Sequence, residues 1–360
     1  MDLAAVVANA RAVRGARPGK ALIAVVKRDA YGHGAVAVAR SLRGVADIIA
    51  VADAEEAAVL RQAGIRAPIL LLGPAAAARR GEIERLGLLP SVTAERDFAG
   101  VPGARGGYLG AHLKFDTGMG RLGLDPALAD RLAGWLRRRG LRRLAGTWTH
   151  LSAADEAGFT RAQLRRFDAA LAALRRGGID PGLTHAANSA AVLASPAACA
   201  YRAVRPGLLL YGCVPGRRPA PRWLRPAMSF RTRVAALRRV ARGATISYDH
   251  TWRAPREATL AVLPVGYADG YSRLQSNRGE VLIRGRRAPV RGIVCMNLTV
   301  VEVTGIRGVA AGDEAVIFGT QGRARIRAEE VAARQATIPY EVLCVAGGLN
   351  RRVRGRNGRA

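Results

Sequence analysis

The sequence lacks the features by which several classes of protein are recognised. Its four cysteines are scattered singly through 360 residues and form neither a disulfide framework nor a paired metal-ligand spacing. No apolar run approaches the ~20 residues that a membrane-spanning helix needs. The start, Met1-Asp2-Leu3, does not have the basic and long apolar segments of a signal peptide. We therefore expect a protein of the reducing cytoplasm, with no membrane partner and no metal site.

Acidic residues are also few, since 27 aspartates and glutamates stand against 57 lysines and arginines, giving a net charge of +30. Such a balance makes a nucleic-acid-binding protein one alternative, which would show sharply salt-dependent DNA binding. The excess, however, is nearly all arginine in short clusters such as residues 137–139 and 351–352, without zinc-finger spacing or a basic leucine zipper. Arginine-rich codon usage with the charge on solvated faces accounts for this pattern. We expect no nucleic-acid partner.

Lysine is the scarcest charged residue, and its positions are informative for that reason. Only Lys20, Lys27 and Lys114 occur in the chain. An amine can lose its proton and condense with a carbonyl group, whereas a guanidinium cannot. Where arginine is otherwise used so freely, the remaining lysines are candidates for that chemistry.

The first two thirds of the chain alternate apolar strand-length runs with amphipathic helical segments such as 127–139 and 161–176. Repeated strand–helix units with nearly continuous apolar strands are typical of a parallel (β/α)8 barrel. We predict such a TIM-like α/β barrel over residues 1–224. The eight expected strands are 22–26, 48–51, 69–72, 88–92, 111–115, 145–149, 183–186 and 208–211.

The pattern changes after Pro215, where a linker rich in proline and arginine is followed by short β-type runs and little helix. Turn residues separate these runs. We predict a smaller, mostly β domain over residues 225–360. Its expected strands include 228–234, 258–262, 280–283 and 298–303.

Polar side chains gather where the predicted barrel strands end. The carboxyl ends of all strands in a barrel meet at one mouth, where active sites lie. These sequence-distant groups are therefore expected to share one pocket. They are Lys27 after the first strand, Lys114 and Asp116 at the fifth, His150 at the sixth, His185 and Asn188 at the seventh, and Arg205 before the eighth.

The motif around Lys27 occupies residues 24–34 and reads AVVKRDAYGHG. A surface lysine after a strand and turn would be the plain interpretation, but partial desolvation at the barrel mouth would lower the pKa of Lys27. The run resembles the cofactor-lysine motif of alanine racemases, differing at Arg28. This resemblance implies that Lys27 carries pyridoxal 5′-phosphate covalently and that Tyr31 bonds its phosphate.

The second motif, HLKFDTGMGRLG at residues 112–123, would on its own be a strand closed by a glycine-rich turn. It is similar to the alanine racemase motif in which the lysine is often carbamylated. The resemblance implies that Lys114 steers Arg121, and that Arg121 holds the substrate carboxylate and the ring oxygen of the cofactor. The planar fork of arginine suits a carboxylate because it gives two parallel charge-assisted bonds.

Three further barrel residues are assigned by the same resemblance. His150, in the run 149–156, is implied to stack beside the cofactor ring, and Ser189, in the run 185–190, to bind its phosphate. Asn188 would support the site. For His185 two roles remain open, structural support and direct contact with the cofactor.

The run RPGLLLYG at residues 205–212 resembles the Arg-Pro-Gly signature of the family. Arg205 is implied to face the pyridine nitrogen, keeping it unprotonated and weakening the cofactor as an electron sink. Gly207 and Leu208 would offer backbone N–H groups to the phosphate.

The β domain carries three runs that resemble family motifs, at residues 247–249, 266–271 and 295–297. They imply that Tyr248 is the second catalytic base, that Tyr267 supports the site, and that Met296 approaches the substrate of the partner subunit. Asn297 departs from the usual aspartate.

Two more departures concern substrate breadth. Ile293 stands where the family often has an arginine lining the entry corridor, and Asn357 where a pocket tyrosine is common. Both changes loosen the steric filter, so we expect activity on serine as well as alanine.

Taken together, the sequence predicts a homodimeric, pyridoxal-phosphate-dependent alanine racemase that uses two bases, Lys27 and Tyr248, on a small amino-acid substrate. Two alternatives share the barrel. A single-domain pyridoxal-phosphate-binding protein lacks the β domain. A decarboxylase of the same fold takes a catalytic cysteine from a different β-domain motif, which this sequence does not contain.

Overall fold

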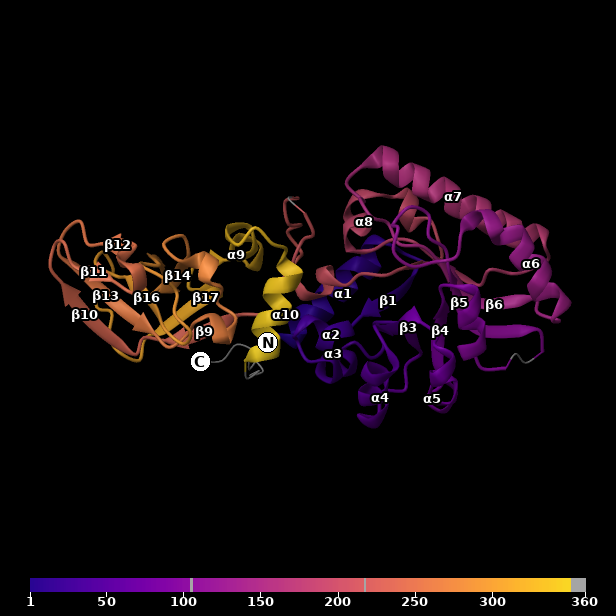
Figure 1. The fold of residues 1–360 in the computed structure, drawn as a ribbon, viewed down its shortest axis with the longest axis horizontal. Coiled ribbons are helices and arrows are strands. Elements are labelled where there is room, and N and C mark those ends of the chain that lie inside the picture. The colour runs from indigo at the N-terminus through magenta and orange to yellow at the C-terminus, as the bar shows by residue number, and fades with distance from the viewer. Residues whose placement is uncertain (104–105, 217, 351–360) are drawn as a thin grey trace.

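The computed structural model describes residues 1–103, 106–216 and 218–350, which form an eight-stranded parallel barrel and a mostly β domain (Figure 1). This architecture confirms the predicted fold class. The barrel closes where β1 pairs with β8, with Ala21 opposite Ala203. Its strands are β1 (Ala21–Val25), β2 (Ile48–Val51), β3 (Ile69–Pro74), β4 (Leu88–Val92), β5 (Tyr108–Lys114), β6 (Arg143–Trp148), β7 (Leu183–His185) and β8 (Ala203–Val204).

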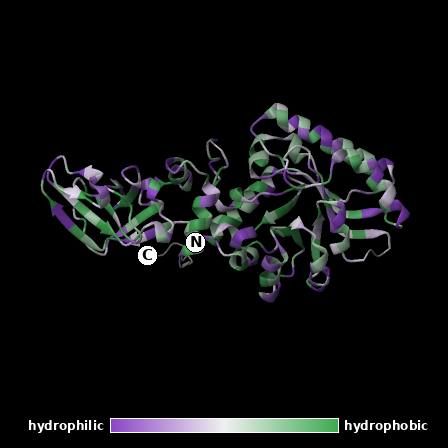
Figure 2. Ribbon diagram, in the orientation of Figure 1, coloured by the Kyte–Doolittle hydropathy of each residue, from purple (hydrophilic) through white to green (hydrophobic). Residues whose placement is uncertain are grey.

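Helical segments lie around the barrel, and the longer ones, such as α1, α6 and α7, bury an apolar face. The strands are nearly continuous in apolar residues because parallel strands in a barrel are covered on both faces. Figure 2 shows apolar strands inside the barrel and hydrophilic segments on the outer helices α6 and α7. The helices are α1 (Leu3–Ala16), α2 (Lys27–Tyr31), α3 (Ala35–Ser41), α4 (Ala54–Gln62), α5 (Arg80–Arg85), α6 (Ala129–Arg138), α7 (Ala157–Arg176) and α8 (Ser189–Ala194).

The prediction of the eighth strand at residues 208–211 is wrong. The strand is β8, a two-residue segment at Ala203–Val204, and Leu208–Tyr211 is a buried 3-10 turn, η5. A short apolar run looks the same in a buried strand and in a buried helical turn, because neither shows a polar face. Arg205 therefore follows the eighth strand and does not precede it, which places it at the barrel mouth with the other strand-end residues.

The second domain consists of short antiparallel sheets. One sheet has the order β10-β13-β16, a second pairs β11 with β12, and a third has the order β15-β14-β17-β18, with β9 also pairing with β17. Their bounds are β9 (Phe230–Arg233), β10 (Ala236–Val240), β11 (Thr245–Ile246), β12 (Trp252–Arg253), β13 (Ala258–Leu263), β14 (Glu280–Ile283), β15 (Arg286–Pro289), β16 (Thr299–Glu302), β17 (Glu314–Gln321) and β18 (Ala324–Ile326).

Two helices, α9 (Ala328–Arg334) and α10 (Pro339–Leu349), follow the sheets, and α10 returns to the barrel (Figure 1). There it crosses α2 with backbone against backbone. A Cβ at Gly347 would lie 2.1 Å from the carbonyl oxygen of Gly32, and one at Gly32 would lie 2.7 Å from that of Leu343. The two glycines permit this contact, which brings α10 beside the Lys27 motif. Within the described part of the chain, every helix is too short or too polar to cross a bilayer.

Candidate active site

A cavity of about 360 Å³ opens at the carboxyl ends of the barrel strands. It brings together nine of the residues singled out from the sequence, together with Trp148 and Tyr340, which the sequence did not indicate. Trp148 ends β6 and Tyr340 lies on α10, so the cavity draws on both ends of the chain. The nine are Lys27, Tyr31, Lys114, Arg121, His150, Asn188, Ser189, Arg205 and Gly207.

Asp116, which was also expected at this pocket, and five other candidates lie outside the cavity. Leu208 and His185 are fully buried behind its wall. Tyr248, Tyr267 and Met296 lie on the β domain with 65%, 40% and 54% of their surface exposed. Asn357, the remaining residue singled out for the pocket, lies outside the described residues.

The backbone around Lys27 is unusual. The four residues from Arg28 to Tyr31 all have positive φ, between 51° and 56°. For residues with a Cβ, this left-handed conformation costs roughly 1–2 kcal/mol each. Such strain persists only where the surroundings over-determine the backbone, and it is concentrated at functional sites. It turns the chain sharply at the end of β1, so that both Lys27 and Tyr31 line the cavity.

Glu56, from the first turn of α4, holds this strained segment. One carboxylate oxygen accepts a hydrogen bond from the N–H of Arg28 at 2.7 Å, and the other accepts from that of Ala52 at 2.9 Å. The Asp29 carboxylate accepts from the N–H of Ala35 at 2.6 Å, which ties the segment to α3. The site lysine is thus positioned by carboxylates that themselves lie outside the cavity lining.

The cavity is strongly cationic. Lys27, Lys114, Arg121 and Arg205 line it, and no carboxylate does so among the described residues. Burial and the neighbouring Arg121 and Arg205 lower the pKa of Lys27 and bring the pKa of Lys114 to about 8. Both amines are therefore closer to their neutral, nucleophilic form than a surface lysine. A site of this kind selects an anionic ligand.

Asp116 shapes the turn that delivers Arg121. Its carboxylate accepts hydrogen bonds from the N–H groups of residues 118, 119, 120 and 121 at 2.8–3.1 Å. These bonds lower the pKa of Asp116 against the effect of its burial. The glycine-rich run predicted from the sequence is therefore a turn built around the Asp116 carboxylate. This turn places Arg121 at the cavity.

Ser189, Gly207 and Tyr31 form a small polar cradle on one side of the cavity. The Ser189 hydroxyl oxygen accepts from the Gly207 N–H at 2.9 Å. A Cβ at Gly207 would lie 2.5 Å from the Tyr31 hydroxyl, so a glycine is required for the two to approach. Asn188 caps α8 through Ala191 and donates to the Leu151 carbonyl, which makes it a structural support of this cradle.

Arg205 is buried, with 3% of its surface exposed, and it pairs with neutral acceptors only. It donates to Nδ1 of His185 at 2.6 Å, to Nδ1 of His150 at 3.1 Å and to the Thr149 carbonyl at 3.1 Å. Its guanidinium lies 4.5 Å from the ring centre of Trp148. Burial lowers the pKa of Arg205 to about 9, which leaves it cationic at neutral pH.

These bonds fix the protonation of a chain of histidines. Arginine can only donate, so Nδ1 of His185 accepts and its proton sits on Nε2. That proton is donated to Nδ1 of His112 at 3.1 Å, which leaves the Nε2–H of His112 buried without a partner. Burial together with Arg205 lowers the pKa of both histidines, to about 3 for His112. His112 was not predicted as a site residue, because its role depends on its ring pointing into the barrel beside Gly146.

Because these histidines are buried, we expect the stability of the folded chain to fall at acidic pH. They are neutral in the folded chain and take up protons on unfolding, so their contribution to stability is complete above about pH 6.5 and is lost as the pH falls toward the folded-state values. We expect the free energy of unfolding to fall by up to about 1.4 kcal/mol per pH unit for each such histidine. Urea titrations at pH 7, 6 and 5 measure this. His185→Gln should flatten the slope and the exposed His250→Gln should not; an unfolding free energy independent of pH would contradict the prediction.

Comparison with known proteins identifies the family. The chain matches the family model of the alanine racemase N-terminal domain over residues 1–215 and that of the C-terminal domain over residues 227–354. It is 43% identical to the alanine racemase of Symbiobacterium thermophilum, covering 98% of this chain and 94% of that protein. The alanine racemase of Sorangium cellulosum is 44% identical, over 91% and 89% of the two chains.

Solved structures give the same result. The alanine racemase of Bacillus anthracis with bound L-Ala-P superposes with a TM-score of 0.86 at 35% identity, over 99% of this chain and 94% of that chain. The alanine racemase from E. faecalis gives 0.87 at 31% identity, over 96% and 94%. The chain therefore belongs to the alanine racemase family of isomerases.

Proposed function

We propose that this protein interconverts L- and D-alanine with pyridoxal 5′-phosphate bound in the barrel cavity. The observation that carries the proposal is the cavity itself, which combines a lysine of lowered pKa with three further cations and a polar cradle. The cofactor fits this donor set, because its phosphate can accept hydrogen bonds from hydroxyl and backbone N–H groups gathered in a confined space. The Gly207 position, where a Cβ would strike the Tyr31 hydroxyl, supplies that space.

The residues for the cofactor follow from their positions. Tyr31, Ser189 and the backbone at Gly207 and Leu208 would bind its phosphate, Arg205 would face its pyridine nitrogen, and His150 would lie beside its ring. Lys27 would hold it covalently. When bound, pyridoxal phosphate supplies an electron-withdrawing ring that acidifies the α-hydrogen of the amino acid attached to it.

The chain's own residues would then bind the substrate and move the proton. Arg121 would bind the substrate carboxylate through its planar fork, with Lys114 beside it. Lys27, once free, would carry the proton on one face of the substrate as a neutral amine, which its lowered pKa favours. Racemisation also requires a proton to be delivered to the opposite face, which a second carrier on that face would do.

Tyr248 would be that second carrier, supplied by another copy of the chain in a homodimer. It is exposed and absent from the cavity of its own chain. The residues beside it, Ser247 and Asp249, have φ values of 65° and 58°, and the Ser247 hydroxyl donates to the Ile293 carbonyl at 2.7 Å. Strained backbone held by side-chain bonds is typical of functional positions. Met296 and Tyr267, exposed on the same domain, would enter the partner's site with it. In this scheme residues 1–224 form the cofactor domain and 225–360 the domain that closes the partner.

An absorbance spectrum and a racemisation assay test the proposal together. The purified protein should be yellow, should lose that absorbance band on borohydride reduction, and should convert L-alanine to the racemic mixture. A colourless protein that does not convert alanine after addition of pyridoxal phosphate would refute the proposal.

Substrate breadth gives a separate prediction. Ile293 places an aliphatic side chain where the family often has an arginine, and a pocket discriminates weakly against one added group unless something blocks it. We expect kcat/KM for serine within about tenfold of that for alanine. Ile293→Arg and, in the part of the chain outside the described residues, Asn357→Tyr should each lower the serine-to-alanine ratio. A parent enzyme strictly specific for alanine, or a ratio that neither variant changes, would show that the departures are without effect.

A further inference from the structure

A second cavity, of about 340 Å³, lies between the end of the barrel and the β domain. Its floor is apolar and buried, formed by side chains from η5, from the segment that leads into β9, from β17 and β18, and from α10. They are Tyr211, Leu224, Met228, Phe318, Ile326 and Leu343. A cavity of this size with a buried apolar floor is large enough for a small organic ligand.

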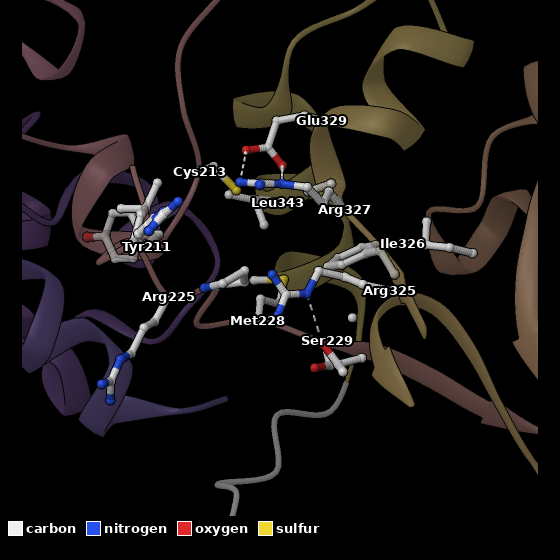
Figure 3. A pocket seen from close by; sticks show the side chains of 17 residues that line it. Tyr211, Cys213, Arg225, Met228, Ser229, Arg325, Ile326, Arg327, Glu329 and Leu343 are labelled. Atoms are coloured by element: carbon white, nitrogen blue, oxygen red, sulfur yellow. Dashed lines mark hydrogen bonds and ion pairs between the residues drawn. The ribbon is translucent and has the colours of Figure 1, made fainter. Parts of the chain in front are cut away.

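Three arginines that line this cavity, Arg222, Arg225 and Arg325, make no ion pair among the described residues. Arg325, on β18, donates from Nε to the Thr320 hydroxyl at 3.3 Å and makes no ion pair among the described residues. In Figure 3 its guanidinium extends across the cavity toward Met228. The Ser229 hydroxyl, close by, makes no hydrogen bond within the described chain. Gly319 allows Ser229 this position, since a Cβ there would lie 2.7 Å from its hydroxyl oxygen.

The remaining charges do not neutralise Arg325. Glu329 is the only carboxylate among the described lining residues, and Arg327 already pairs with it at 3.1 Å. The backbone N–H of Val214 donates to the same carboxylate at 3.0 Å. Arg225 lines the cavity but extends away from Arg325 (Figure 3). The cavity therefore presents the guanidinium fork of Arg325 and two hydroxyl groups above an apolar floor, and Arg222 and Arg225 add positive charge to its lining.

We propose that this interdomain cavity binds a small organic anion, with one carboxylate or phosphate group on an apolar body about the size of a benzene ring. The planar fork of Arg325 would take two oxygens of the anionic group, and Ser229 and Thr320 would donate to it. The apolar body would cover Met228, Phe318 and Leu343. The site is separate from the catalytic cavity, since Arg325 belongs to one and Arg121 to the other.

Isothermal titration of the holoenzyme with phenyl phosphate and with benzoate tests the proposal, with inorganic phosphate as the probe that lacks an apolar body. Arg325→Ala should weaken binding of the organic probe at least about tenfold, because a charge-assisted pair is lost. The matched control is Arg323→Ala, which removes the same charge from an exposed position two residues away and should change Kd by less than about twofold. Arg325→Lys keeps the charge but not the fork and should bind with intermediate affinity.

Arg121→Ala separates this cavity from the catalytic one, which also attracts anions. If the probe occupies the proposed site, its Kd for Arg121→Ala should equal its Kd for the parent. Arg325→Ala should catalyse racemisation at the parent rate. Equal affinity of Arg323→Ala and Arg325→Ala would show that only the general positive charge attracts the probe. Loss of binding in Arg121→Ala would place the probe in the catalytic cavity. If inorganic phosphate binds as tightly as phenyl phosphate, the claim that the cavity binds an apolar body is wrong.

Discussion

Replacing Lys27 with alanine is expected to abolish racemisation, with kcat/KM lower by at least about 10⁴-fold, because one residue serves as cofactor anchor and as proton carrier. Lys27→Arg should be equally inactive, although it keeps the positive charge, since a guanidinium neither condenses with a carbonyl group nor gives up its proton at neutral pH. Lys20→Ala is the matched control. Lys20 does not line the cavity, and its ammonium donates to the Ala200 carbonyl. Its loss should therefore leave the rate unchanged.

The position of the cofactor can be read independently of the rate. Borohydride reduction of the parent enzyme, followed by peptide mass spectrometry, should find the pyridoxyl group on Lys27. Lys114 is the critical alternative, because it lines the same cavity and its pKa is also lowered. A pyridoxyl group on Lys114 or Lys20 would overturn the assignment of Lys27.

Lys27 could be predicted as a site residue from a local pattern, because an apolar strand ends in one of the few lysines of the chain. The left-handed backbone that follows was not predictable in the same way. In the run from Arg28 to Tyr31 only Asp29 is of a residue type enriched at positive φ, and only Tyr31 is followed directly by a glycine. The conformation depends on Glu56, a residue of the next strand–helix unit whose carboxylate bonds the Arg28 N–H. Bonds between units are a tertiary property that a local pattern does not contain.

The histidine chain shows the same limit. His150 and His185 stand at strand ends and were expected at the mouth, whereas the role of His112 depends on where its ring points. It lies inside the barrel, and the distance of 3.1 Å to His185 follows from the pairing of β5, β6 and β7. Trp148 could have been found, since it directly precedes the motif at residues 149–156 and β6 ends on it.

Tyr340 could not be predicted as a cavity residue from the sequence. Glycines at 347 and 348 disfavour a helix, by roughly 1 kcal/mol each relative to alanine, so α10 was not expected. Packing against α2 overrides this preference, because the missing Cβ at Gly347 is what lets the two backbones meet. The Tyr340 ring then lies 5.6 Å from that of Tyr31, at the edge of the cavity.

Tyr248→Phe is expected to lower racemisation by about 10²–10⁴-fold, the usual contribution of a general acid–base group. The substitution removes only the hydroxyl from a side chain that is 65% exposed, so folding and cofactor content should be unchanged. The face that Lys27 serves keeps its proton carrier. In deuterium oxide, one enantiomer of alanine should therefore continue to exchange its α-hydrogen without inverting, as followed by proton NMR with chiral analysis. Racemisation by Tyr248→Phe near the parent rate would contradict the two-base scheme.

Mixing the two inactive variants shows which chain supplies Tyr248. In a dimer of one Lys27→Ala chain and one Tyr248→Phe chain, one site contains both substitutions and the other contains neither, provided that each site takes Tyr248 from its partner. Random pairing makes about half of the dimers mixed, so co-expressed chains should recover about one quarter of the parent activity per site. A site built from one chain would contain one substitution in every case, and no activity would return. Co-expression of each variant with itself is the control, and two affinity tags select the mixed dimer, whose activity should rise to about half. The structure favours recovery, because the cavity that holds Lys27 includes none of the described residues between 208 and 339 of its own chain.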